Sequence, residues 1–236
     1  MKRNSKPRDL VAAIAVAALL TVMPPVNPAQ AAGGAFAVDD AGVDDVGACK
    51  VEAFTSFARN SDFAGVVAPA CVVSLGRPVD IGAQIDRARS GGEWGTGLTL
   101  KAKTAIVPFT DDAKFGMAIA GGVGFDLTAR ETAEWFVTVP VSIRLSEIFQ
   151  INLNVGGLWD RIEDRGFVTW GAGFEIAFAA QFTVLGEVFG QGSDDPGAQL
   201  GLRYRPHERV DFDVIYGRNL TGERSDWITL GVNLRF

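Results

Sequence analysis

The sequence has few of the side chains from which active sites are built. Its 236 residues include one histidine, His207, and two cysteines, Cys49 and Cys71, so a metal site based on the cysteines lacks further ligands. The sequence also lacks the glycine–serine motif of hydrolases, a phosphate-binding loop and a cluster of metal ligands. We therefore expect a protein without catalytic residues, metal or cofactor.

Positive charge is also scarce. The chain has 22 lysines and arginines against 28 aspartates and glutamates, and its formal net charge is −6. No basic stripe runs along any segment. This balance argues against a nucleic-acid partner.

Helical periodicity is missing after the N-terminal apolar run. Instead, segments of about ten residues alternate between apolar and polar residues, which is typical of strands. The segments are 79–86, 97–108, 115–129, 135–145, 149–159, 167–178, 182–190, 198–204, 210–216 and 227–236. With a hairpin over 49–59 and 63–75 they predict twelve strands; if that hairpin lies outside the wall, ten remain.

The two faces of these segments differ in charge. One face is apolar without a charged residue, whereas the other carries the charges. A closed barrel of twelve strands is too wide to fill with aliphatic side chains, because about eight strands already give a just-filled interior. We therefore expect an all-β, closed antiparallel transmembrane barrel with its apolar face toward lipid. A soluble β-protein that buries the apolar face is the alternative.

The C-terminal segment WITLGVNLRF carries a second signal. Its apolar residues recur at every second position up to Phe236, and Thr229, Gly231, Leu234 and Phe236 match the polar-x-Gly-x-x-apolar-x-aromatic tail of outer-membrane β-barrels. The chain therefore resembles that superfamily. The resemblance implies an outer-membrane location and insertion by the barrel-assembly machinery, which reads this tail.

The N-terminus has the features of a secretory signal peptide. A basic head precedes an apolar run over 11–23, and small residues around Ala31 suit cleavage there. The run is shorter than the roughly 18–20 residues that a spanning helix needs. We expect residues 1–31 to be removed on Sec-type export from a Gram-negative cytoplasm.

Cys49 and Cys71 lie almost symmetrically about the turn Asn60–Asp62. In a hairpin centred there they lie near each other, and an exported chain meets an oxidising compartment. This favours a disulfide over two free buried thiols.

Two kinds of aromatic residue lie at opposite ends of the predicted strands. With the C-terminus in the periplasm, as the resemblance implies, the tryptophans lie at outer strand ends and several phenylalanines at periplasmic ends, as in the girdles of membrane barrels. The expected girdle residues are Trp94, Trp135, Trp159, Trp170, Phe115, Phe149, Phe182 and Phe236. Trp227 falls on the polar face.

The polar face predicts the lining of the lumen. The candidates are Lys101, Lys103, Asp126, Arg144, Glu175, Glu187, Arg203, Arg205, Asp211 and Asp213. A hairpin turning near 207–209 places Arg203 opposite Asp213 and Arg205 opposite Asp211, which favours ion pairs over a field that sorts solutes by charge. Lys101 and Lys103 either line open space or pair with Asp126 or Asp86.

Residues 32–48 are small, acidic and unpatterned. We expect a flexible, solvated periplasmic tail in preference to a cation site or a plug, because the spacing lacks a calcium-loop pattern.

These features support a small porin-like passive channel. A non-conducting structural or adhesion barrel is the alternative, and a lipid-modifying enzyme is disfavoured because such chemistry generally uses a histidine, and His207 falls in a periplasmic turn. Solute specificity and oligomeric state are not determined by the sequence.

Overall fold

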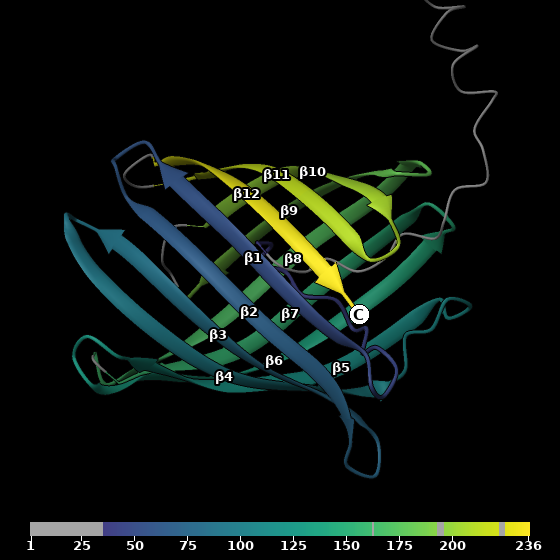
Figure 1. Cartoon of the computed structure of the whole chain (residues 1–236), viewed down its shortest axis with the longest axis horizontal. Coiled ribbons are helices and arrows are strands. Elements are labelled where there is room, and N and C mark those ends of the chain that lie inside the picture. The colour runs from purple at the N-terminus through teal and green to yellow at the C-terminus, as the bar shows by residue number, and fades with distance from the viewer. Residues whose placement is uncertain (1–34, 162, 193–195, 222–224) are drawn as a thin grey trace, which may run out of the picture.

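The computed structural model describes residues 35–161, 163–192, 196–221 and 225–236. In this part of the chain twelve antiparallel strands close into one barrel, in which neighbours in sequence pair and β1 pairs with β12 (Figure 1). The predicted twelve-strand barrel is confirmed, and the ten-strand alternative is wrong because the first hairpin lies in the wall. The predicted signal peptide, residues 1–31, lies outside the described residues.

The strands are ten to sixteen residues long, as oblique crossing of a membrane requires. Their bounds are β1 Cys49–Ala58, β2 Phe63–Ser74, β3 Pro78–Ser90, β4 Glu93–Val107, β5 Phe115–Asp126, β6 Glu131–Ser146, β7 Phe149–Asp160, β8 Arg165–Ala179, β9 Phe182–Gln191, β10 Gly197–His207, β11 Val210–Asn219 and β12 Asp226–Arg235. No helix among the described residues has the length and apolar character needed to span a bilayer.

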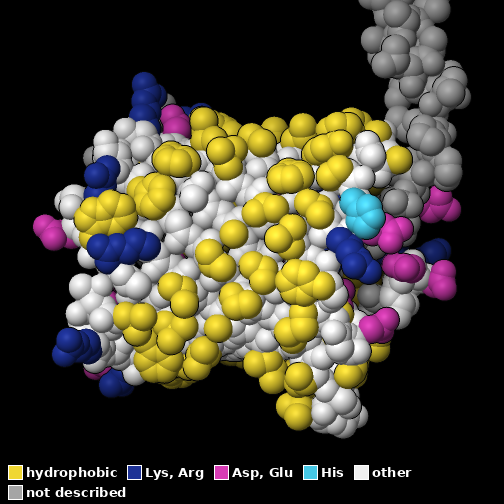
Figure 2. Space-filling model, viewed as in Figure 1, with side chains coloured by type: hydrophobic (Ala, Val, Ile, Leu, Met, Phe, Trp, Pro, Cys, Tyr) yellow, Lys and Arg dark blue, Asp and Glu magenta, His cyan; other side chains and the backbone are white. Residues whose placement is uncertain are grey.

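The apolar face of the strands points outward. Val155, Leu200 and Val214 lie in mid-strand and are 55–57% exposed, whereas Arg203 and Asp213 are almost fully buried. Figure 2 shows hydrophobic side chains across the middle of the visible face and charged ones toward its two ends. This arrangement is the opposite of the soluble alternative and is what lipid requires.

The predicted register of the β10–β11 hairpin is confirmed. Arg203 pairs with Asp213 and Tyr204 with Phe212, and a bulge follows Tyr204. Between β4 and β5, Lys101 lies opposite Gly122 and Lys103 opposite Ala120. Pro140 interrupts the β5–β6 ladder, but the register is the same on both sides of it.

The barrel has two distinct ends. The loop end carries the connections that begin at 59, 91, 127, 161, 192 and 220, and the C-terminal end carries Cys49, Phe236 and the other connections. The segments expected at 79–86 and 97–108 are too short at the loop end: only Gly91 and Gly92 form the turn between β3 and β4, and they adopt positive φ angles of 57° and 94°. Strands β3 and β4 therefore extend further at the loop end than the sequence suggested.

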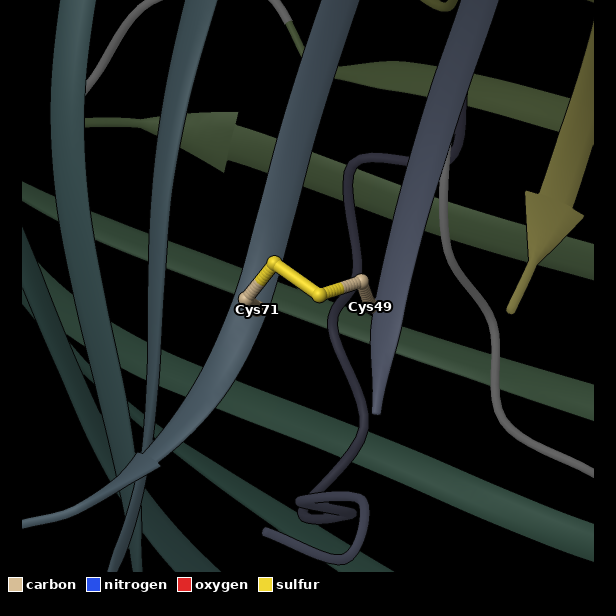
Figure 3. The surroundings of a disulfide bond; sticks show 2 residues. All are labelled: Cys49 and Cys71. Carbon is tan, nitrogen blue, oxygen red and sulfur yellow. A yellow bond between two sulfur atoms is a disulfide. The ribbon is translucent and has the colours of Figure 1, made fainter. Parts of the chain in front are cut away.

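The predicted disulfide is confirmed. Cys49 and Cys71 are directly paired residues of β1 and β2, and their sulfur atoms are bonded (Figure 3). Both cysteines lie at the C-terminal end, on the same side of the wall as exposed Val67 and Val73. The bridge therefore fixes the hairpin that begins the barrel.

Candidate functional site in the barrel lumen

A chain segment that precedes the first strand occupies part of the lumen. Residues 36–41, called here the lumenal segment, contact the inner side of the wall, and Val38 and Ala41 are buried. The beginning of the described chain, purple in Figure 1, lies within the ring of strands. For residues 36–41 this placement corrects the expectation of a solvated periplasmic tail over 32–48; residues 32–34 lie outside the described part of the chain.

Hydrogen bonds from the wall hold the backbone of the lumenal segment. The Glu187 carboxylate accepts from the backbone N–H groups of Ala37 and Val38, at 2.8 and 2.9 Å. The Asn154 side chain pairs with the backbone of Asp39 in both directions, at 2.7 Å each. These bonds satisfy buried backbone groups that would otherwise lose their water partners.

Two further wall residues fix the end of the segment. Ser142 Oγ accepts from the backbone of Ala41 at 2.9 Å. Lys103 Nζ donates to Asp39 Oδ1 at 3.0 Å and to the carbonyl of Asp40 at 3.1 Å. The predicted partners of Lys103, Asp126 and Asp86, are therefore wrong, because its carboxylate partners come from the segment that the sequence placed outside.

Glycines in the wall make room for the apolar side chains of the segment. A Cβ at Gly171 would lie 2.7 Å from Val38 Cγ2, and a Cβ at Gly201 would lie 2.7 Å from Phe36 Cζ. Both distances are shorter than van der Waals contact. The Phe36 ring also lies 5.7 Å from the guanidinium of Arg203. The wall is thus shaped to receive these two side chains.

Burial affects the ionisation of the segment. Asp40 is 4% exposed, and this loss of solvent raises the pKa of its carboxyl to about 6, with Lys103 opposing the shift and Asp39 adding to it. A group with this pKa changes charge just below neutral pH.

The inner side of β7 to β12 is filled by a polar network. Arg203 donates to Asp213 at 2.8 Å, and Arg205 and Arg235 each lie 2.5 Å from a different oxygen of Asp211. Asn233 also donates to Asp213. These contacts agree with the ion-pair interpretation of the β10–β11 hairpin.

Glu175 and Glu187 extend this network. Asn152 donates to Glu175 at 2.8 Å, and Gln199 donates to Glu187 at 2.8 Å. Trp227, which the sequence placed on the polar face, donates its indole N–H to Gln199 at 3.1 Å. Charged and neutral polar residues together therefore fill this side of the lumen.

The other side of the lumen is not filled by side chains of the described residues. A cavity of about 440 Å³ lies between the lumenal segment and the inner side of β1 to β8. Its charged lining residues are Lys50, Lys101, Lys103, Asp39, Glu52, Asp80 and Glu134. This volume falls within the roughly 300–1,000 Å³ of small-molecule sites.

Most of the charges in this cavity are paired. Lys50 lies 3.7 Å from Glu52 and 3.5 Å from Asp80, and Lys103 is paired with the lumenal segment. Within the described part of the chain, no carboxylate lies within 4 Å of the amine of Lys101. Lys101 lies opposite Gly82 and Gly122, whose lack of side chains leaves space around it. Among the described residues it is therefore the lysine of this cavity whose amine lacks a carboxylate partner.

Two predicted lumen residues close turns instead of lining the cavity. Asp126 accepts from the backbone N–H groups of Thr128 and Ala129 at the loop end. Arg144 donates to the carbonyls of Thr110 and Ala113 and lies over the Phe109 ring. Both residues act near the ends of the barrel.

The girdle candidates lie at the two ends, as the sequence indicated. At the loop end Trp135 stacks on Trp159 with centroids 6.1 Å apart, and Trp94 and Trp170 are exposed on the lipid side. At the C-terminal end Phe182 stacks on Tyr204, and Phe115 and Phe236 are exposed. Phe149 lies there too, as the first residue of β7.

The residues of the C-terminal tail lie on both sides of the wall. Thr229 points inward and forms a hydrogen bond with Ser56, whereas Leu234 points outward.

No group of residues suited to a metal ion occurs in the described ranges. His207 lies at the end of β10, and its Nδ1 accepts from the backbone of Arg209 at 3.3 Å.

Sequence reasoning missed the neutral residues that hold the lumenal segment, Ser142 and Asn154, and also missed Lys50, Glu52 and Glu134 as cavity residues. In the sequence all five alternate with apolar residues that face outward, so the alternating pattern would have identified them as lumen residues. The seating of Phe36 carries no comparable signal, because residues 32–48 have no pattern.

The closed wall, outward apolar face and polar lumen define a transmembrane β-barrel of the outer-membrane class. The chain belongs to the family described as uncharacterised conserved protein UCP029691, whose model matches residues 18–236. A comparison with curated protein sequences finds no match.

Solved structures share the fold. The KdgM porin in complex with disordered oligogalacturonate superposes with a TM-score of 0.63 at 12% identity, covering 79% of this chain and 99% of that one. The NanC porin gives 0.60 at 8% identity, with 78% and 98% covered. The COG4313 outer membrane channel from Pseudomonas putida F1 gives 0.60 at 13% identity, with 84% and 98% covered. At these identities the likeness concerns the fold.

Proposed function

We propose that this protein is a passive channel for small hydrophilic solutes, which pass between the lumenal segment and the inner side of β1 to β8. The observation that carries the proposal is the cavity of about 440 Å³ inside the barrel, lined by charged and polar side chains. A barrel that serves only as a scaffold has no need of such a space. Two porins and an outer membrane channel share this fold with TM-scores of 0.60–0.63, which supports this choice.

The proposal includes a location. The signal peptide directs the chain across the inner membrane, and the tail residues Thr229, Gly231, Leu234 and Phe236 are recognised by the assembly machinery of the outer membrane. The C-terminal end then faces the periplasm, and the loop end faces outward. Fractionation with and without detergent tests the location: recovery of folded protein in the soluble periplasmic pool would contradict it.

Planar bilayers test the channel. Protein that is heat-modifiable, and therefore folded, is expected to give discrete conductance steps in zwitterionic lipid. Absence of steps from protein with confirmed fold would remove the channel proposal. Boiled protein added to the same bilayer is the control for leakage.

A second candidate is a barrel that does not conduct, and the lumenal segment is the observation that favours it. This segment is held inside the lumen by Glu187 of β9 and Lys103 of β4, beside the polar network of β7 to β12. A variant lacking residues 36–41 distinguishes the two functions. Conduction by both proteins, larger in the variant, supports a channel narrowed by the segment, whereas conduction by the variant alone supports a plugged barrel.

A further inference from the structure

Two arginines lie on the lipid-facing side of β3, at the loop end. Alternation along β3 places Arg87 and Arg89 on the same side as Ile81 and Ile85, which are 46% and 55% exposed. Arg89 is the residue before the last of the strand, and it pairs with Trp94 of β4. A charge on this side is tolerated only near the interface of the bilayer, and the two arginines are at that height.

An aromatic cluster holds the two guanidinium groups. The guanidinium carbons of Arg87 and Arg89 lie 5.1 and 5.7 Å from the centre of the Trp94 ring. Trp94 packs against Phe63 at 5.9 Å, and Phe63 against Phe57 at 5.4 Å. Cation–π contacts of this kind restrict the arginines to one region of the surface. Figure 2 shows Lys and Arg side chains around large hydrophobic ones at this end of the visible face.

Both arginines retain donors for a ligand. Arg87 donates from Nη1 to Thr96 Oγ1 at 2.7 Å, and Arg89 donates from Nε at 3.2 Å and also from Nη2 to the carbonyl of Ser61. A guanidinium group has five N–H donors, so these bonds orient each group and leave further donors of both arginines for a ligand.

The charges of this pair have no acidic partner in the part of the chain that the structure describes. Across the described ranges no carboxylate lies within 4 Å of either guanidinium. Two other arginines at the loop end differ, because Arg59 and Arg218 lie 3.7 and 3.6 Å from Asp226. Two cations over one indole ring repel each other, and an anion between them would relieve the repulsion.

We infer that Arg87, Arg89 and Trp94 form a binding site for the phosphate of a phosphorylated glycolipid headgroup in the outer leaflet. The inference rests on the proposed location and orientation, which place lipid headgroups against this side of the wall. Guanidinium groups bind phosphate in bidentate geometry, and the exposed Trp94 face supplies an apolar surface for the sugar.

Lipid binding to the folded barrel in detergent tests the site, with native mass spectrometry as the readout and diphosphorylated lipid A as the probe. The double variant Arg87→Gln/Arg89→Gln is expected to bind lipid A about tenfold more weakly than the unmodified protein, which corresponds to about 1.4 kcal/mol. The matched control is Arg59→Gln/Arg218→Gln, which removes the same charge from the same end of the barrel. Equal loss in the control, or no loss in the double variant, would overturn the assignment.

A second measurement needs no variant. Lipid A without its phosphates is expected to bind the unmodified protein as weakly as the double variant binds the phosphorylated form. Equal binding of both forms by the unmodified protein would overturn the site.

If phosphatidylglycerol binds as tightly as lipid A and is equally sensitive to the double variant, the site recognises any anionic lipid and the glycolipid assignment is wrong. If glutamine prevents folding, Arg87→Lys/Arg89→Lys retains charge and is expected to lose several-fold affinity, because lysine lacks the bidentate geometry. Conductance in lipid-A-free bilayers is independent of all these outcomes.

Discussion

Lys103 Nζ lies 3.0 Å from Asp39 Oδ1, which joins β4 to a segment that precedes the first strand. The bond spans 64 residues of sequence and connects the wall to the lumenal segment. Together with the bonds from Glu187, Asn154 and Ser142 it determines how much of the lumen stays open.

Gly171→Val is expected to displace the lumenal segment while the wall still folds. The new side chain would occupy the position of Val38 Cγ2, since even a Cβ there would lie 2.7 Å away. Limited proteolysis of the N-terminal segment should accelerate, and conductance should rise toward that of the variant lacking 36–41. Gly173→Ala is the control, because its nearest contacts are ordinary at 3.4 Å. Equal protection of the segment in both variants would contradict the seating.

Seating of the segment is expected to weaken as pH rises through about 6. Burial raises the pKa of Asp40 from 3.8 to about 6, so the seated form binds the proton more tightly than the released form. The seated state is therefore favoured most below pH 4 and loses roughly 3 kcal/mol of that preference by pH 7. Conductance and proteolysis of the segment should be lower at pH 4.5 than at pH 7.5. Asp40→Asn should abolish the difference; a pH response that survives in this variant would point to another group.

Lys101→Glu is expected to shift ion selectivity toward cations. Lys101 lines the cavity without a carboxylate partner among the described residues, so its charge acts on passing ions. Coulomb's law gives roughly 0.5 kcal/mol per unit charge about 8 Å away in water, so the two-unit change of Lys101→Glu amounts to roughly 1 kcal/mol, or about a sixfold change in local ion concentration. Reversal potentials in a KCl gradient measure the shift. Lys114→Glu, in an exposed turn, should leave them nearly unchanged; equal shifts in both variants would contradict the placement of the pore.

Asp211→Asn is expected to destabilise the barrel strongly. Asp211 is fully buried and neutralises Arg205 and Arg235, with Arg203 at 3.9 Å. Loss of one partner in a buried charge cluster costs about 3–5 kcal/mol. Urea unfolding in detergent, followed by heat-modifiability, should show a lower midpoint. Asp126→Asn, which affects only an exposed turn, is expected to cost far less; similar midpoints for both variants would argue against the network.

Removal of the Cys49–Cys71 bridge is expected to destabilise the first hairpin. The bridge closes a loop with a separation of 22 residues, for which chain entropy predicts a contribution of about 3 kcal/mol. Cys49→Ser/Cys71→Ser should unfold at lower urea concentration. The unmodified protein treated with reductant should match the double variant, and a difference between them would indicate an effect of the substitutions themselves.

Much of the wall was predictable because its chemistry repeats along the sequence. Alternation assigned Leu202 and Val214 to lipid and Arg203 and Asp213 to the lumen, since successive side chains of a strand point to opposite faces. The β10–β11 register followed because both faces gave sensible pairs in the same alignment. The disulfide followed because the hairpin turn lies midway between the cysteines. Each of these inferences uses residues close together in sequence.

The lumenal segment was not predictable in the same way. Residues 36–41 carry no period, and the groups that receive them, Gly171, Glu187 and Asn154, lie more than a hundred positions later. The aspartates of the lumenal segment suggested that it is exposed to water, whereas Lys103 neutralises Asp39 inside the barrel. Such a contact depends on shape and charge that exist only once the ring of strands has closed.

The sequence by itself predicted the membrane barrel, its disulfide and the lumenal side for charges such as Arg203 and Asp213, because these follow from a two-residue period and short-range pairing. It left a choice between ten and twelve strands, and it did not assign Arg87 and Arg89 to a side of the wall. Only the tertiary structure decided which part of the lumen is filled, which lysine of the cavity lacks a carboxylate partner among the described residues, and where two arginines lie over one indole ring. Those features arise from distant residues that closure brings together, and no local pattern encodes such distances.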